Sequence, residues 1–197
     1  MTVQMLRASD RLETPWKNGG GVTREIAVFP PGVDLDAFDW RVSMATVSTG
    51  GPFSRFPGVD RVLSVLEGEL RLTFDSGAAL NLTPRSAPAA FAGDVPVQAE
   101  TPINPATDLN VMTRRDRVRA SVTRVAFEKS QTLTASETTL ILSHTPGLRL
   151  RHASGECHLE RLDAALIAGD EGKLIDLGAG GPAMVFRIDL IRLKGEA

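Results

Sequence analysis

Residues 62–77 read VLSVLEGELRLTFDSG, and this stretch decides the class of the fold. Its first part, Val62–Leu66, is apolar on both faces, which is typical of a central strand of a sheet. Glu67–Gly68 then predicts a tight turn into a second strand. Polar and apolar residues alternate in that second strand, Glu69–Asp75, so one face is buried and the other meets water. The apolar face carries Leu70, Leu72 and Phe74.

Similar short runs recur along the whole chain, separated by glycine and proline, which number 18 and 12. Their spacing of roughly 8 to 12 residues is typical of a β-sandwich or β-barrel. No long helical periodicity is visible, and only short helices are expected, near residues 6–12 and 115–121. The sequence therefore predicts an all-β protein. Further strands are expected at residues 21–29, 40–47, 109–114, 138–143, 148–151, 158–162, 174–177 and 183–193.

The length of 197 residues suffices for two small lobes, each with its own core. We expect the first lobe at residues 1–120, with the ligand pocket, and the second at residues 121–197. No low-complexity linker lies between them. The second lobe is therefore expected to pack tightly on the first.

Composition excludes several classes of protein. A net charge of −2 predicts no nucleic-acid partner. The one cysteine, Cys157, excludes a disulfide framework and indicates a reducing compartment. The N-terminal MTVQMLRASD lacks the apolar core of a signal peptide, and no apolar run approaches the roughly 20 residues that a membrane span needs. We expect a cytoplasmic protein with no membrane partner.

The first candidate site is the loop PWKNGGG at residues 15–21. Three consecutive glycines allow close approach of backbone or ligand, and their N–H groups can hold an anion. Lys17 and Asn18 would then contact the ligand. The alternative is a tight loop that covers a barrel mouth, with Trp16 as a packing plug. The order Gly-Lys-Ser/Thr of a phosphate-binding loop is absent.

Two strands carry further candidates. In WRVSMATV (residues 40–47), Arg41 and Ser43 share one face with a small residue, Ala45. That face is either solvated or the lining of a polar cavity. In DLNVM, Asn110 alternates with Asp108, and its amide could bind a ligand or satisfy buried backbone groups.

The stretch GPFSRFPGVDRVLSVLEG (residues 51–68) resembles the first motif of the cupin superfamily, without its metal ligands. Phe56, Pro57 and Gly58 stand where cupins carry histidine, and Arg61 falls at or next to the usual glutamate. FAGDVPV (residues 91–97) is similar to the second cupin motif, with its histidine replaced.

Together with PWKNGGGVTREI (15–26), WRVSMATV (40–47) and DLNVMTRR (108–115), the stretch resembles the HutD/Ves family. The resemblance implies a bicupin fold of two jelly-roll lobes, often as a homodimer. For HutD members it implies a modulator of histidine utilisation, and for Ves members a stress-related role.

A cupin barrel without its metal lacks a Lewis acid, and Arg61 would supply a fixed cation with five donors instead. A bidentate arginine–carboxylate contact in a partly desolvated pocket contributes about 1.5–3 kcal/mol. That contribution selects an anion over a neutral analogue by roughly tenfold to a hundredfold. The alternative for Arg61 is a salt bridge to an acid at the edge of the core.

We therefore expect a metal-free, cofactor-free protein that binds a small organic anion. Urocanate or a formyl- or formimino-glutamate would fit the resemblance. The expected ligand-binding residues are Arg61, Lys17, Asn18, Arg41, Ser43 and Asn110. No catalytic residue is assigned, and the three histidines and Cys157 lack the spacing of a metal set.

Two alternatives remain open. A metal-independent enzyme acting on the same acids would use Glu25 or Asp60 as its base, the nearby acids that could serve. An interaction module would keep only a vestigial pocket.

Overall fold

The computed structural model describes residues 3–103, 105–153 and 155–193. Within these ranges the chain is built of antiparallel strands, and its helical content is one 3₁₀ helix, η1 (Ala8–Asp10). The predicted all-β class is confirmed. The chain divides into two compact units: a central unit, Leu12–Val118, and a terminal unit formed by Met1–Arg11 with Arg119–Ala197.

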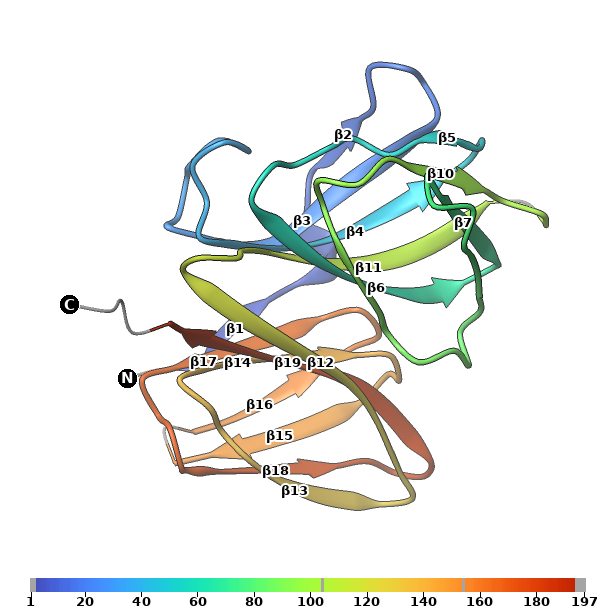
Figure 1. Cartoon of the computed structure of the whole chain (residues 1–197). Coiled ribbons are helices and arrows are strands. Elements are labelled where there is room, and N and C mark those ends of the chain that lie inside the picture. Colours follow the sequence, from blue (N-terminus) through green and yellow to red (C-terminus); the bar gives the residue numbers. More distant parts are fainter. Residues whose placement is uncertain (1–2, 104, 154, 194–197) are drawn as a thin grey trace. The chain divides into compact units, whose positions relative to one another are not determined.

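The central unit consists of two antiparallel sheets (Figure 1). The six-stranded sheet has the order β2 (Glu13–Pro15), β3 (Gly21–Phe29), β4 (Trp40–Val47), β11 (Ala106–Arg114), β6 (Val59–Glu67) and β9 (Ala89–Ala92). The four-stranded sheet has the order β5 (Gly51–Pro52), β10 (Val97–Glu100), β7 (Leu70–Phe74) and β8 (Ala79–Leu82).

The terminal unit has the same two-sheet plan. Its five-stranded sheet has the order β1 (Gln4–Leu6), β17 (Ala164–Ala168), β14 (Thr138–Ser143), β19 (Ala183–Arg192) and β12 (Val118–Phe127). Its four-stranded sheet has the order β13 (Ser130–Thr134), β18 (Leu174–Gly178), β15 (Leu148–His152) and β16 (Gly155–Leu159). The N-terminal residues belong to this unit because β1 pairs with β17.

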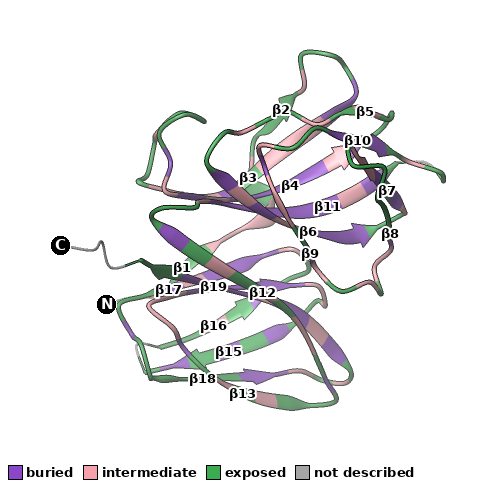
Figure 2. Ribbon diagram, viewed as in Figure 1, coloured by how far each residue is buried: buried purple, intermediate pink, exposed green. Residues whose placement is uncertain are grey.

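Burial alternates along β7, β10 and β15, whereas the central strands β6 and β11 are buried over most of their length (Figure 2). Leu70 and Leu72 are buried while Arg71, between them, is exposed. The apolar run in β6 lies inside its sheet, between β11 and β9, which confirms it as a central strand. Gly68, after β6, has φ +76°, and a Cβ there would lie 2.8 Å from the Pro105 carbonyl oxygen, so the turn requires glycine.

Two expectations about elements are corrected. The helix expected near residues 115–121 is wrong, because a turn closed by the Arg117 N–H on the Arg114 carbonyl leads directly into β12. The strand expected at 158–162 begins and ends earlier, at Gly155–Leu159. Leu162 has φ +68°, a conformation that a strand does not accommodate.

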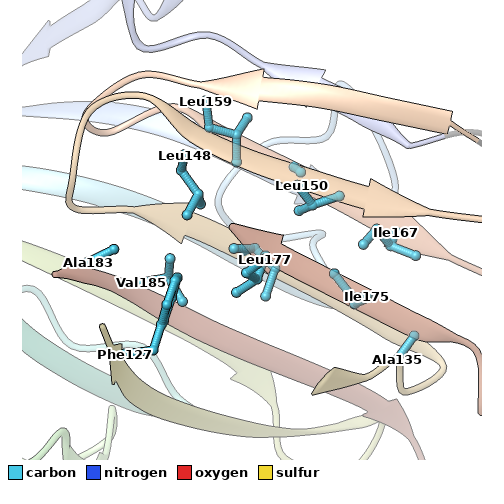
Figure 3. Packing of buried hydrophobic residues seen from close by; sticks show 12 residues of the cluster. Phe127, Ala135, Leu148, Leu150, Leu159, Ile167, Ile175, Leu177, Ala183 and Val185 are labelled. Atoms are coloured by element: carbon cyan, nitrogen blue, oxygen red, sulfur yellow. The ribbon is translucent and has the colours of Figure 1, made fainter. Parts of the chain in front are cut away.

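Each unit has its own hydrophobic core. In the terminal unit, a cluster of buried aliphatic side chains and Phe127 fills the space between the sheets. Figure 3 shows that the drawn side chains of this cluster are carbon only, without a polar atom among them. The central unit has a similar core from both of its sheets, but its interior also holds charged side chains. None of the described helical segments has the length and hydrophobicity of a membrane-crossing helix.

Candidate functional site

Polar side chains gather on the inner face of the central unit's six-stranded sheet. Directly opposite residues of neighbouring antiparallel strands point to the same side of a sheet. Asn110 on β11 lies opposite Ser43 on β4. Met112, two residues further along β11, lies opposite both Arg41 on β4 and Arg61 on β6. Alternation adds Asp108 to the same face. Apolar residues of these same rows belong to the core of the unit, so the face points inward.

Arg61 is the most unusual member of this cluster, because its side chain lies inside the core with only 7% of the residue exposed. Its Nε donates to Asn110 Oδ1 at 3.3 Å. The guanidinium carbon lies 4.9, 5.3 and 6.0 Å from the ring centroids of Phe53, Phe91 and Phe56. Aromatic faces at these distances stabilise a cation that has lost its water. The structure therefore holds Arg61 in an aromatic cage.

The guanidinium keeps its charge and most of its hydrogen-bonding capacity. Burial lowers the pKa of Arg61 to about 10, Asp108 opposes this fall and Arg41 adds to it, so the group is a cation at neutral pH. Its Nη nitrogens have no hydrogen-bond partner among the described residues, since the bond to Asn110 uses Nε. An anion would satisfy both the charge and these donors.

Asp108 is the second buried charge of the cluster, with 2% of the residue exposed. Its Oδ1 accepts no hydrogen bond. Burial raises the pKa of this carboxyl to about 7, and the attraction of Arg61 counteracts the rise. The two groups interact electrostatically, yet no ion pair joins them in the described structure. The salt bridge that the sequence left open for Arg61 is therefore absent at Asp108.

Arg41 and Ser43 form the more polar side of the cluster. Arg41 Nε donates to Glu25 Oε2 at 2.8 Å, and its Nη1 lies 3.4 Å from Ser43 Oγ. The Arg41 side chain is 14% exposed and the Glu25 side chain 45%, so this pair reaches toward solvent. Ser43 itself is buried. This strand face is therefore mostly buried rather than solvated.

Two β-irregularities border the cluster. The register of β3 against β4 shifts between Glu25 and Ala27, and that of β11 against β6 shifts between Thr107 and Asp108. Bulges of this kind re-aim side chains and occur often beside functional sites. Here they lie at the two carboxylates of the cluster.

The structure does not bring Lys17 and Asn18 into this group. Both residues are exposed, and Asn18 Oδ1 accepts from the Gly20 N–H at 3.0 Å, which uses the amide within the loop. The loop leads into Gly21, which pairs with Val47, about 20 Å along β4 from Arg41 at strand rise. Trp16 donates from Nε1 to Thr23 and packs against the core, as a plug at that end of the sheet.

Sequence reasoning missed Asp108 and the aromatic cage. The alternation that marks Asn110 in DLNVM places Asp108 on the same face, so a signal for it existed. The cage had no local signal, because Phe53 and Phe56 lie in the loop before β6 and Phe91 lies in β9. The two acids considered as bases are engaged elsewhere: Glu25 by Arg41, and Asp60 by Arg115 Nε at 2.7 Å.

In the part of the chain that the structure describes, no group of three or more His, Cys, Asp or Glu side chains could hold a metal ion. The cationic groups of the cluster, Arg61 and Arg41, suit an anion.

The HutD family model matches residues 8–185. Protein Ves of Cronobacter sakazakii is 46% identical over 112 residues, 56% of this chain and 60% of that protein, so the match spans less than two thirds of the Ves length. An uncharacterized 21.2 kDa protein in the hutC 3′ region of Pseudomonas putida is 37% identical over 141 residues, 71% of this chain and 72% of that protein.

Solved structures agree with this assignment. HutD from Pseudomonas fluorescens SBW25 superposes with a TM-score of 0.83 at 29% identity, covering 98% of this chain and 100% of that one. A cupin 2 conserved barrel domain protein from Leptotrichia buccalis, at 8% identity, superposes with a TM-score of 0.63 and covers 97% of this chain and 98% of that one, which supports the fold alone. The chain belongs to the HutD family and has its cupin-like, all-β fold.

Proposed function

We propose that this protein binds a small organic carboxylate inside the central unit and, through that binding, modulates histidine utilisation. One observation carries the binding part: Arg61 is a buried cation whose Nη donors have no partner among the described residues. A guanidinium with so little water around it is stabilised by a counter-charge and by acceptors for its free N–H groups. A carboxylate offers the charge and the planar pair of acceptors that match a guanidinium.

The pathway part rests on relatives. One relative lies in the hutC 3′ region of Pseudomonas putida, and a structure similar over nearly the whole chain is a HutD. Urocanate and N-formyl- or N-formimino-glutamate are the acids that such an association favours. A stress-related role, as the Ves resemblance implies, is the alternative context.

The binding test is titration calorimetry with urocanate and N-formylglutamate at pH 7. The wild-type protein is expected to bind one of them, and Arg61→Met is expected to weaken that binding by about tenfold to a hundredfold. Arg71→Met is the matched control, because Arg71 is exposed on β7. Equal affinity of the wild type and Arg61→Met would remove Arg61 from the site.

A metal-independent enzyme acting on the same acids is the second candidate, and Asp108 favours it. A buried carboxyl beside the anion-binding Arg61, with its pKa raised to about 7, has the properties of a general base at neutral pH. Incubation of the pure protein with each acid, followed by mass spectrometry and by NMR in D₂O, tests this candidate. Conversion or proton exchange that Asp108→Asn abolishes would favour catalysis, whereas an unchanged acid favours a binding protein.

A further inference from the structure

Two opposite charges lie inside the same apolar core without forming an ion pair. Arg61 and Asp108 are 7% and 2% exposed, and each shifts the pKa of the other. Buried opposite charges normally stabilise each other through direct contact. Here Arg61 bonds instead to Asn110, which lies between the two charges in the inward-facing row of β11. The fold therefore keeps donor and acceptor apart within one site.

Among the described residues, no group donates a hydrogen bond to the Oδ1 atom of Asp108. In the sheet it lies opposite Ala45 on β4 and Val65 on β6. Neither side chain can donate a hydrogen bond, and Oδ1 is buried without a partner. Burying a carboxyl oxygen in this state destabilises the folded protein unless a group donates a hydrogen bond to that oxygen. The register of β11 against β6 shifts beside this group, between Thr107 and Asp108.

We propose that Asp108 is a second recognition group of the site, which accepts a hydrogen bond from an N–H or O–H group of the ligand. This assignment rests on the proposed function, and it narrows the class of ligand. The ligand is an acid with two ends: a carboxylate that binds the Nη donors of Arg61, and a donor group that reaches Asp108. A simple monocarboxylate such as formate satisfies only the first end.

The ligand series that tests this pairing keeps size and carboxylate constant. Urocanate and 3-(pyrrol-2-yl)acrylate carry a ring N–H, whereas 3-(2-furyl)acrylate has the same shape with an oxygen in its place. The wild-type protein is expected to bind the N–H acids at least about tenfold more tightly than the furan. The reason is that the furan cannot donate a hydrogen bond to the carboxylate of Asp108.

Three variants distinguish the hydrogen-bonding role of Asp108 from an effect of changed packing. Asp108→Leu is close in size and removes the acceptor, so it is expected to bind all three acids with similar affinity. Asp108→Asn keeps an acceptor oxygen without the charge and is expected to retain part of the preference. Thr113→Val, on the opposite face of β11, is the matched control and is expected to keep the full preference. Thermal unfolding of each variant verifies that it is folded.

The outcomes distinguish this assignment from the proposed function. If the wild type binds the furan as tightly as the N–H acids, or if Asp108→Leu keeps the preference, then Asp108 faces only a water molecule and the assignment is overturned while the proposed function stands. If the wild type binds none of these acids and no N-formylglutamate, the proposed function fails, and the role of Asp108 fails with it.

Discussion

Arg61 combines three properties: burial, a retained charge and unused donors. Its three aromatic neighbours stabilise the cation without consuming any N–H group, because they act through their ring faces. Asn110 consumes one donor. The remaining donors are held in a fixed plane, and a planar acceptor pair is the group that matches them.

Replacing Arg61 by lysine tests the shape of this group separately from its charge. A lysine keeps the charge, but it loses the planar fork and the stacking on Phe53 and Phe91. We expect Arg61→Lys to lower the affinity for the bound acid by about tenfold or more. Calorimetry measures this loss, with Arg71→Lys on β7 as the control. An unchanged affinity would show that charge alone binds the ligand.

Asp108 predicts an unusual dependence of stability on pH. Its pKa is about 7 in the folded protein against 3.8 as a model value, so between these values the folded state binds more protons than the unfolded state. This group therefore makes the protein less stable as pH rises from about 4 to about 7, and its contribution is constant above that range.

The variant Asp108→Leu removes this pH-dependent contribution. We expect it to be more stable than the wild type at pH 8, by a few kcal/mol on the linkage argument, with a much smaller difference at pH 4. Denaturant unfolding at the two pH values measures the change. A stability gain of the same size at both values would mean that Asp108 is ionised throughout.

At the residue scale the sequence predicted part of the inward-facing cluster. Alternation within one strand is a local property, and it correctly placed Arg41 with Ser43 and marked Asn110. The loop residues Lys17 and Asn18 are distant from this group along β4, because the direction of a loop at a sheet end is set by tertiary pairing. The aromatic cage depends on contacts between separate segments, which no local pattern encodes.

At the scale of elements, strands with a clear pattern were predictable, but β12, which is ten residues long, was missed, and a short helix was expected where it begins. The strands β3, β4 and β14 match the predicted ranges 21–29, 40–47 and 138–143. Each has a run of apolar and β-branched residues long enough to show its period. The edge strands β1, β2 and β5 span two or three residues, and they form only because a neighbouring strand offers a partner.

The start of β3 depends on a glycine for steric reasons. A Cβ on Gly21 would lie 2.5 Å from the Thr46 carbonyl oxygen and 3.2 Å from the Trp16 ring. We expect Gly21→Ala to destabilise the protein by about 1–3 kcal/mol, since both neighbours are held by the sheet and the core. Gly51→Ala is the control, because a Cβ there meets nothing within 4 Å. Chemical denaturation measures the stability of the two variants. Equal stability would mean that the loop before β3 shifts to make room for the added methyl group at little cost in free energy.

At the scale of the whole molecule, the two units share a plan and differ in their interiors. The terminal unit has a carbon-only core in the cluster drawn in Figure 3. Its buried acids lie outside that cluster and are engaged, Asp163 by Arg7 and Asp170 by Lys173. The central unit alone buries an arginine without a carboxylate partner among the described residues. The alternation in the sequence revealed the all-β class of both units. The difference between their interiors depends on which strand faces pack against each other in the folded chain, and this is not a local property of the sequence.

This difference predicts the stoichiometry of binding. Although the fold is doubled, we expect one acid to bind per chain, and we expect Arg61→Met to weaken that single event. Calorimetry with a known active concentration measures the ratio. A second equivalent that persists in Arg61→Met would place a site outside the central unit.

The binding of an acid by Arg61 is tested most directly by a crystal structure of the protein with urocanate or N-formylglutamate bound. We expect the ligand's carboxylate inside the central unit, within about 3 Å of both Nη nitrogens of Arg61. An acid bound elsewhere on the chain, with Arg61 still contacting only Asn110 and its aromatic cage, would contradict it.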